Sequence, residues 1–248
     1  MPDRFEIALK QSVTLNLTSG MAFPELETGP KRERVAAALG RVAGHTFDMS
    51  DISAGPKSLI FKTEPAESGV AAFWIKLPPR AIELKTDEVK EYLDEVSAPA
   101  ALQKQWSEMK EPKRWRESYT KHPKTFVRVG DSTSDQSWKE PVGMFLEIVP
   151  EGDPTALRAG EDFSVRVLKD GAPFADFALN AVSAGDKRGE TRKTDGAGRV
   201  TFQLSKAGPW LFRGTDIRKS TLPDADWESD FVTLTVEAKP RLTDKPQN

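Results

Sequence analysis

Residues 163–174 read FSVRVLKDGAPF, an alternating apolar segment that runs into a turn. Phe163, Val165 and Val167 recur at every second position, which places their side chains on one face of a β-strand. Asp170-Gly171 follows, and glycine readily adopts the positive φ that a chain reversal needs. The stretch therefore predicts two strands joined by a tight turn.

Segments of the same kind fill the chain after Lys124, and a second glycine-rich turn, at residues 194–198, precedes one of them. Short strands at this density predict a β-sandwich. We therefore expect a C-terminal sandwich domain of the transthyretin or immunoglobulin-like class over residues 141–240. The strands predicted after Lys124 span residues 125–129, 144–149, 163–168, 174–182, 199–204, 210–213 and 231–236.

Residues 1–140 predict a second β-rich domain. Residues 5–18 alternate in the strand manner, and residues 59–62 and 70–77 have β-type composition. Prolines and glycines interrupt residues 20–56, which we expect to form loops. The predicted fold class is mainly β with two β-rich domains. Domains have roughly 150 residues on average, so a chain of 248 residues has room for two small ones.

A helical insert is predicted at about residues 86–121. Val89, Leu93 and Val96 lie at helical spacing, and the same spacing recurs from Leu102 to Tyr119 with interruptions at prolines. Eight basic and eight acidic residues lie between Lys85 and Lys121, so the charged face is a solvated one rather than a basic patch.

Composition excludes several classes of function. Thirty-six basic and 38 acidic residues leave a formal charge of -2, so we expect no nucleic-acid partner. No apolar run is long enough for a membrane helix, so we expect no direct membrane insertion. The absence of cysteine excludes disulfides and thiolate nucleophiles, and only two histidines remain for imidazole chemistry.

The two ends of the chain carry little pattern. No apolar leader follows Met1, which leaves two interpretations: a cytoplasmic protein, or a chain whose start is missing. Residues 241–248 are polar, and we expect a mobile tail there.

Several motifs between residues 124 and 237 resemble a bacterial family of periplasmic proteins. The motifs are Phe126–Gly130, Val142–Pro150, Asp153-Pro154, Leu157, Ala159-Gly160, Val165–Leu168, Gly171–Pro173, Thr194–Gly196, Gly198–Phe202, Gly208–Leu211 and Thr233–Val236. Members of that family are described as domains of unknown function or as periplasmic components of nickel and cobalt uptake systems. The resemblance implies a periplasmic, non-catalytic binding or accessory protein with a membrane metal-transport complex as its partner.

The start of the chain departs from that family. Its members begin with a histidine, two further residues and a tryptophan, whereas only Met1 precedes Pro2 here. The resemblance therefore implies that nickel or cobalt binds through an N-terminal segment missing from this sequence, because a terminal amine, an imidazole and amide nitrogens suit such ions.

One internal segment could also bind a metal. His45, Asp48 and Asp51 lie within seven residues, and imidazole and carboxylate groups suit nickel or cobalt. The alternative is that the two aspartates cap a turn. His122 lies between Lys121 and Pro123, where we expect it to be exposed, and no nucleophile beside it indicates a general base.

The six tryptophans suggest a second class of function, glycan binding or hydrolysis in the cell envelope. Trp106, Trp115 and Trp210 fit the predicted core. Trp138 is the best candidate for an exposed ring that binds a ligand. Asp224 and Asp226 could form a glycosidase pair, although carboxylates are too abundant for a pair to be informative. We predict no catalytic residue and no enzymatic activity.

Overall fold

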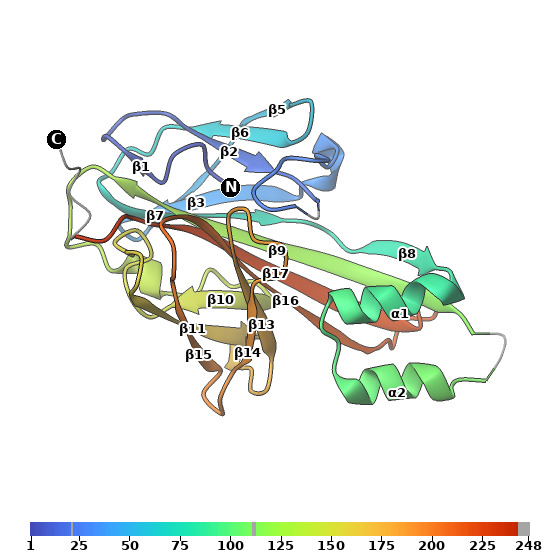
Figure 1. Ribbon diagram of the computed structural model, residues 1–248. Coiled ribbons are helices and arrows are strands. Elements are labelled where there is room, and N and C mark those ends of the chain that lie inside the picture. The colour runs from blue at the N-terminus through green and yellow to red at the C-terminus, as the bar shows by residue number, and fades with distance from the viewer. Residues whose placement is uncertain (21, 111–112, 243–248) are drawn as a thin grey trace.

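The central layer is a long sheet whose neighbouring strands β9 (Trp115–Val129) and β17 (Trp227–Ala238) run parallel (Figure 1). This computed structural model describes residues 1–20, 22–110 and 113–242. Within those ranges the sheet has ten strands in the order β14-β13-β16-β17-β9-β7-β3-β4, and β1 and β8 also pair with β9. Its other strands are β1 (Glu6–Ile7), β3 (Ala37–Val42), β4 (His45–Asp48), β7 (Gly69–Lys76), β8 (Arg80–Leu84), β13 (Ala178–Ser183), β14 (Glu190–Lys193) and β16 (Gly208–Lys219).

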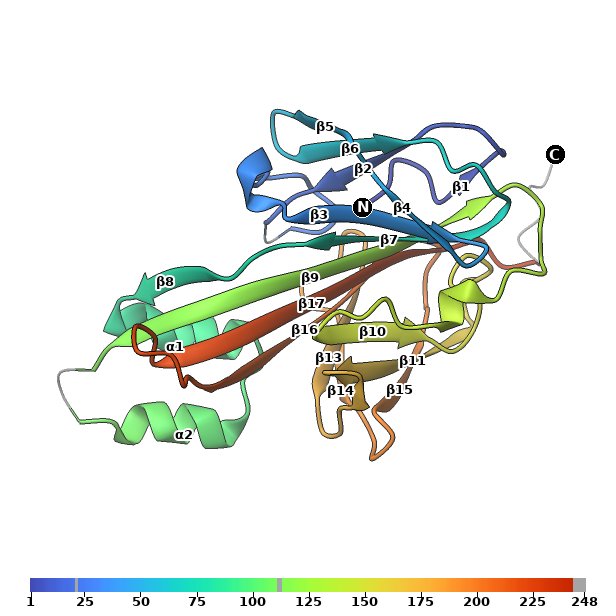
Figure 2. The same cartoon turned by 180° about the vertical axis from the view of Figure 1, so that it is seen from behind.

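Two smaller sheets cover opposite faces of the large one (Figures 1 and 2). Phe126 belongs to the core beneath one of them and Val127 to the core beneath the other, because consecutive residues of a strand point to opposite faces. The sheet on the Val127 side contains β2 (Val13–Leu17), β5 (Asp51–Ala54) and β6 (Leu59–Thr63). The sheet on the Phe126 side contains β10 (Leu146–Pro150), β11 (Asp162–Lys169), β12 (Ala172–Pro173) and β15 (Arg199–Gln203).

The predicted fold class is confirmed: the chain is mainly β, and its sheets pack as a β-sandwich. In the C-terminal part the rings of Phe163 and Phe202 pack against Phe212 of the large sheet, with centroid distances of 5.2 and 5.6 Å. Phe163 and Phe202 lie opposite each other on β11 and β15. Their burial forms the interior of the sandwich.

The large sheet takes strands from both sides of residue 140. β9 pairs with β17 from Glu117↔Trp227 to Thr125↔Thr235, and β7 pairs with the other edge of β9. The division into domains at residues 1–140 and 141–240 stays a prediction. The β9–β17 ladder joins a strand of the first predicted domain to a strand of the second.

The helical prediction is confirmed in part. α1 (Thr86–Glu95) and α2 (Ala100–Glu108) form where expected, with Val89, Leu93 and Trp106 buried. The extension through Trp115 and Tyr119 is wrong, because β9 begins at Trp115. Residues four apart share a face in a strand as well as in a helix, so this spacing alone could not distinguish the two.

The loop prediction for residues 20–56 is also wrong in part, because β3, β4 and β5 lie there, together with the 3₁₀ turn η1 (Arg32–Arg34). Gly40 lies in β3, and a Cβ at this position would lie 2.4 Å from Cζ of Phe47 on β4. The glycine therefore allows close packing within a strand rather than a break.

Two further expectations concern membrane-spanning helices and the C-terminal tail. In the described part of the chain no helix has the length and apolarity to cross a membrane. Of the predicted mobile tail, residues 243–248 lie outside the described residues.

Candidate functional site

One face of β9 is covered at both ends and hollow in the middle. Val127 and Val129 pack under the sheet of β2, β5 and β6, whereas Trp115 packs against the two helices. Between these cores the alternate residues Tyr119 and Lys121 line a cavity of about 830 Å³. The cavity thus lies over the middle of β9, between the large sheet and the edge of the N-terminal layer.

Aromatic and aliphatic side chains form most of the apolar wall. Leu211 on β16 and Phe231 on β17 line it from the large sheet, and Leu15 and Phe23 line it from the N-terminal layer. The rings of Tyr119 and Phe231 meet edge to face with centroids 6.0 Å apart. A pocket of this size and composition suits a small organic molecule.

The charged residues of the wall are mainly cationic. Lys31, Arg34, Arg80, Lys121, Lys124 and Arg213 line the cavity, against Glu25 and Glu33 as the acidic residues. Lys124 is neutralised on the other face of the sheet, where its Nζ lies 2.6 Å from Oε1 of Glu147. Lys31 lies 4.0 Å from Glu33. The wall therefore keeps a positive surplus.

Lys121 is the central cation of this wall. Its Nζ donates to Oγ of Ser19 at 3.1 Å and lies 5.8 and 6.0 Å from the ring centroids of Tyr119 and Phe231. In the described ranges no carboxylate lies within 4.0 Å of it. Burial, and secondly the charge of Arg80, lowers the pKa of Lys121 below its ordinary value.

Two arginines lie on the same wall. Nε of Arg213 donates to Oδ1 of Asn180 at 3.2 Å, a neutral partner that leaves the guanidinium charge uncompensated. Arg80 begins β8, whose first pair joins it to Tyr119 of β9. Three strands thus contribute cations to one hollow.

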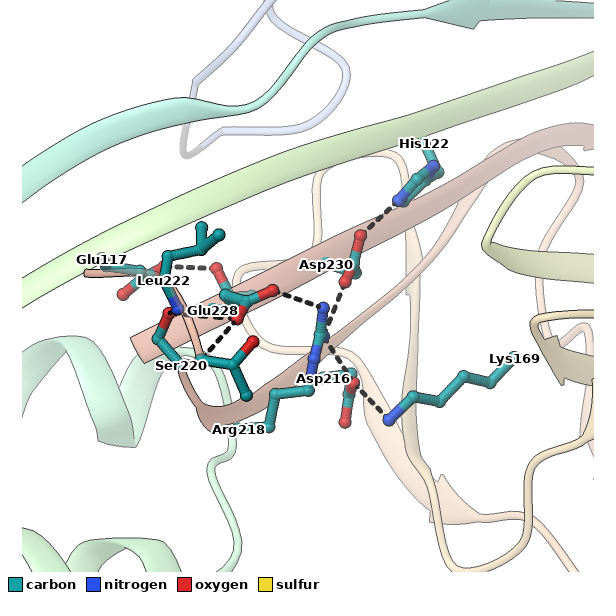
Figure 3. A network of polar contacts seen from close by, with 11 residues as sticks. Glu117, His122, Lys169, Asp216, Arg218, Ser220, Leu222, Glu228 and Asp230 are labelled. Atoms are coloured by element: carbon teal, nitrogen blue, oxygen red, sulfur yellow. Dashed lines mark hydrogen bonds and ion pairs between the residues drawn. The ribbon is translucent and has the colours of Figure 1, made fainter. Parts of the chain in front are cut away.

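A second polar cluster lies around Asp230 on β17 (Figure 3). Oδ1 of Asp230 lies 2.7 Å from Nε2 of His122, and its Oδ2 accepts from Nη1 of Arg218 at 2.7 Å. Arg218 also contacts Asp216, which pairs with Lys169 at 2.8 Å. Burial alone would raise the pKa of Asp230, but the hydrogen bonds from His122 and Arg218 hold it below its ordinary value.

His122 was expected to be exposed, and this expectation is wrong, because its side chain is only 11% exposed. β9 is a strand through this position, and its pairing with β17 places His122 opposite Val232, one pair beyond Phe231. Each carboxylate of the cluster, Asp216, Glu228 and Asp230, has a basic partner, so the cluster fits a role in joining β9, β16 and β17.

The predicted metal residues do not come together. Nδ1 of His45 lies 2.7 Å from Oε1 of Glu67, on an exposed surface. His45 and Asp48 lie on β4 of the large sheet, whereas Asp51 lies on β5 of the three-stranded sheet. Among the described residues no group of three histidine, aspartate or glutamate side chains could hold a metal ion. The internal residues therefore do not fit a nickel or cobalt site.

All six tryptophans are buried. This confirms the core assignment of Trp106, Trp115 and Trp210. The expected exposure of Trp138 is wrong: its ring is 4% exposed and its Nε1 donates to the carbonyl of Asp135 at 3.1 Å. The 3₁₀ turn η2 (Ser137–Lys139) folds the ring into the core of the sandwich.

Of the suggested acidic pair, Asp226 is bound by Arg116. Asp226 forms a two-pronged ion pair with Arg116, at 2.9 and 3.0 Å, and accepts the backbone N–H of that residue. These bonds lower the pKa of Asp226. The glycan hypothesis stays a prediction, without an exposed tryptophan to support it.

The sequence interpretation missed Lys121, Arg80 and Arg213. Lys121 fell at the end of the segment predicted as helical, and the two arginines lay in strands or loops without a motif. The available signal was the alternation Tyr119, Lys121, Pro123, Thr125, which places a lysine between residues of one strand face.

Comparison with known proteins gives one family. The model of a family described as a domain of unknown function (DUF4198) matches residues 1–215. No curated protein matches the chain. Among solved structures, the D0-D1 domain of intimin is similar at 12% identity, over 96% of each chain and with a TM-score of 0.24.

Proposed function

The chain belongs to the DUF4198 family. From the cavity on its central sheet, and from the resemblance of residues 124–237 to periplasmic proteins, we propose that it is a non-catalytic binding protein of the bacterial cell envelope. The cavity is its ligand site. The observation that carries the proposal is a hollow of about 830 Å³ with apolar walls and a few convergent polar groups. Such a combination holds and orients small ligands.

The proposal predicts that filling the cavity abolishes ligand binding. Thr233 lines the cavity from β17, and Thr233→Trp would place an indole in the hollow. We expect the fluorescent probes 8-anilinonaphthalene-1-sulfonate and N-phenyl-1-naphthylamine to bind the native chain, and Thr233→Trp to weaken the binding at least tenfold.

The matched control is Thr46→Trp on the edge strand β4, where Thr46 is exposed, which adds the same ring away from the cavity. Fluorescence titration and circular dichroism of all three proteins separate lost binding from lost folding. Equal binding by the native chain and a folded Thr233→Trp variant would place the ligand elsewhere and overturn the proposal.

We propose as a finer role that the protein assists nickel or cobalt uptake in the periplasm, with a membrane metal-transport complex as its partner. The support is the resemblance of residues 124–237 to components of such systems. Since the described side chains hold no metal cluster, we expect residues 1–248 to bind nickel and cobalt weakly or not at all.

Isothermal titration tests the metal role directly. The present chain is compared with a longer form, processed to expose an N-terminal histidine ahead of Pro2. Tight binding by the longer form alone supports the role. Tight binding by the present chain that His45→Ala abolishes would instead place the site around His45 and Glu67.

A further inference from the structure

We propose that the cavity selects an organic anion, namely a carboxylate, sulfonate or phosphate head group on an apolar body, with Lys121 as the counter-ion. This inference rests on the proposed function, because it names the ligand class of the same cavity. It follows from the charge, the burial and the layout of the wall.

The first step is the charge of the wall. After Lys124 pairs with Glu147 and Lys31 with Glu33, the remaining charged side chains are Arg34, Arg80, Lys121 and Arg213 against Glu25. Cations on three strands that face one hollow create a positive potential, and low-dielectric walls strengthen it. A neutral or cationic ligand would not use this potential.

The second step is the unmet bonding capacity of Lys121. An ammonium group has three donors, and the described residues offer it one hydroxyl, Oγ of Ser19, and two aromatic faces. Lys121 is half-buried, so this cation is partly removed from water without a carboxylate partner, which is unfavourable. An anionic head group at Nζ would supply the missing charge and the missing acceptors at once.

The third step is the separation of polar and apolar walls. Lys121 and Arg213 provide charge, whereas Leu211, Phe231 and Leu15 provide apolar surface within the same cavity. A simple inorganic ion would leave that surface bare. An anion with an aromatic or aliphatic body matches both parts.

Two naphthyl probes that differ in charge test the inference. 8-Anilinonaphthalene-1-sulfonate and N-phenyl-1-naphthylamine share their ring system, and only the first carries a sulfonate. We expect the sulfonate to bind the native chain at least tenfold more tightly. We expect Lys121→Met to weaken the sulfonate roughly 10- to 100-fold, the range for a charge-assisted hydrogen bond, and to leave the neutral probe unchanged.

Two variants serve as controls. Lys121→Arg keeps the charge and should bind the sulfonate within about threefold of the native chain, the scale of a small geometric change. Lys76→Met removes an exposed lysine at the end of β7 and should change neither probe. Dodecanoate should displace the sulfonate, which extends the result to a carboxylate. Dodecanol is its neutral counterpart and serves as the control.

The outcomes separate the two proposals. If Thr233→Trp weakens neither probe, the cavity is not the ligand site and both proposals fail. If Thr233→Trp weakens both probes but Lys121→Met changes neither, the cavity binds ligands and the inference of an anion is overturned. Loss of sulfonate binding in both variants, restored in Lys121→Arg, supports it.

Discussion

At the scale of single residues, Lys121 is the proposed counter-ion of the ligand, and the burial of its charge destabilises the folded state. Burial and the charge of Arg80 lower its pKa below the ordinary value of 10.5. At pH values between the folded-state pKa and 10.5 the unfolded chain binds more protons, so this group favours folding more as the pH rises. Below the folded-state pKa the lysine is charged in both states, and the cost of burying the charge is present in full.

We therefore predict that Lys121→Met stabilises the protein while it weakens anion binding. A methionine fills the same space and contacts the rings of Tyr119 and Phe231 without a charge. Its melting temperature at pH 7 should exceed that of the native chain by about 2–4 °C, or roughly 1 kcal/mol. The difference should shrink as the pH approaches 10.5. A lower melting temperature at pH 7 would show that Lys121 stabilises the fold.

At the scale of elements, a buried ion pair joins β9 to β10. The side chains of Lys124 and Glu147 are 2% and 1% exposed. Burial lowers the pKa of Lys124, and Glu147 opposes that shift. Glu147 also accepts the backbone N–H groups of Val142, Gly143 and Met144, so its carboxylate fixes the entry to β10 as well.

We predict that Lys124→Met costs about 3–5 kcal/mol of unfolding free energy, because it leaves a buried carboxylate without its cation. Urea denaturation measures this value. Lys76→Met at an exposed position should change it by less than about 0.5 kcal/mol. Adding Glu147→Gln to Lys124→Met should recover part of the loss, since the amide oxygen still accepts backbone N–H groups and carries no charge. No recovery would show that packing, not charge, sets the cost.

At the scale of the whole molecule, the ten-stranded sheet passes through both predicted domains. The parallel pair β9–β17 joins residues 115–129 to residues 227–238, and each cover packs on the same layer. Neither half can bury its sheet face completely without strands of the other.

We therefore predict one cooperative unfolding transition. Far-ultraviolet circular dichroism and tryptophan fluorescence should give coincident urea curves, because the tryptophans lie in separate cores: Trp138 and Trp210 in one, and Trp106, Trp115 and Trp227 in another. Two separate transitions would instead support independent domains divided at residue 140.

Part of the fold was readable from local pattern. Alternation at residues 163–168 and the Asp170-Gly171 turn predicted a sandwich, and helical spacing predicted α1 and α2. These features depend on near neighbours in the chain, and hydrophobic period and turn chemistry report on such neighbours directly. Burial of Trp106 and Trp210 followed for the same reason, whereas Trp115 was expected to be buried on a helix and is buried on the strand β9.

The cavity and its cations depended on tertiary structure. β9 and β17 pair over a separation of about a hundred residues, and no local signal carries the register that places Lys121 opposite Phe231. Trp138 and His122 were expected outside and lie inside, because partners distant in the chain cover them. The sequence by itself determined most strands of the C-terminal sandwich and the two helices, since these follow from local spacing, but not β3, β4, β5 or the start of β9. Only the tertiary structure decided which strand faces stay partly uncovered, because that depends on where the covers of the sheet end.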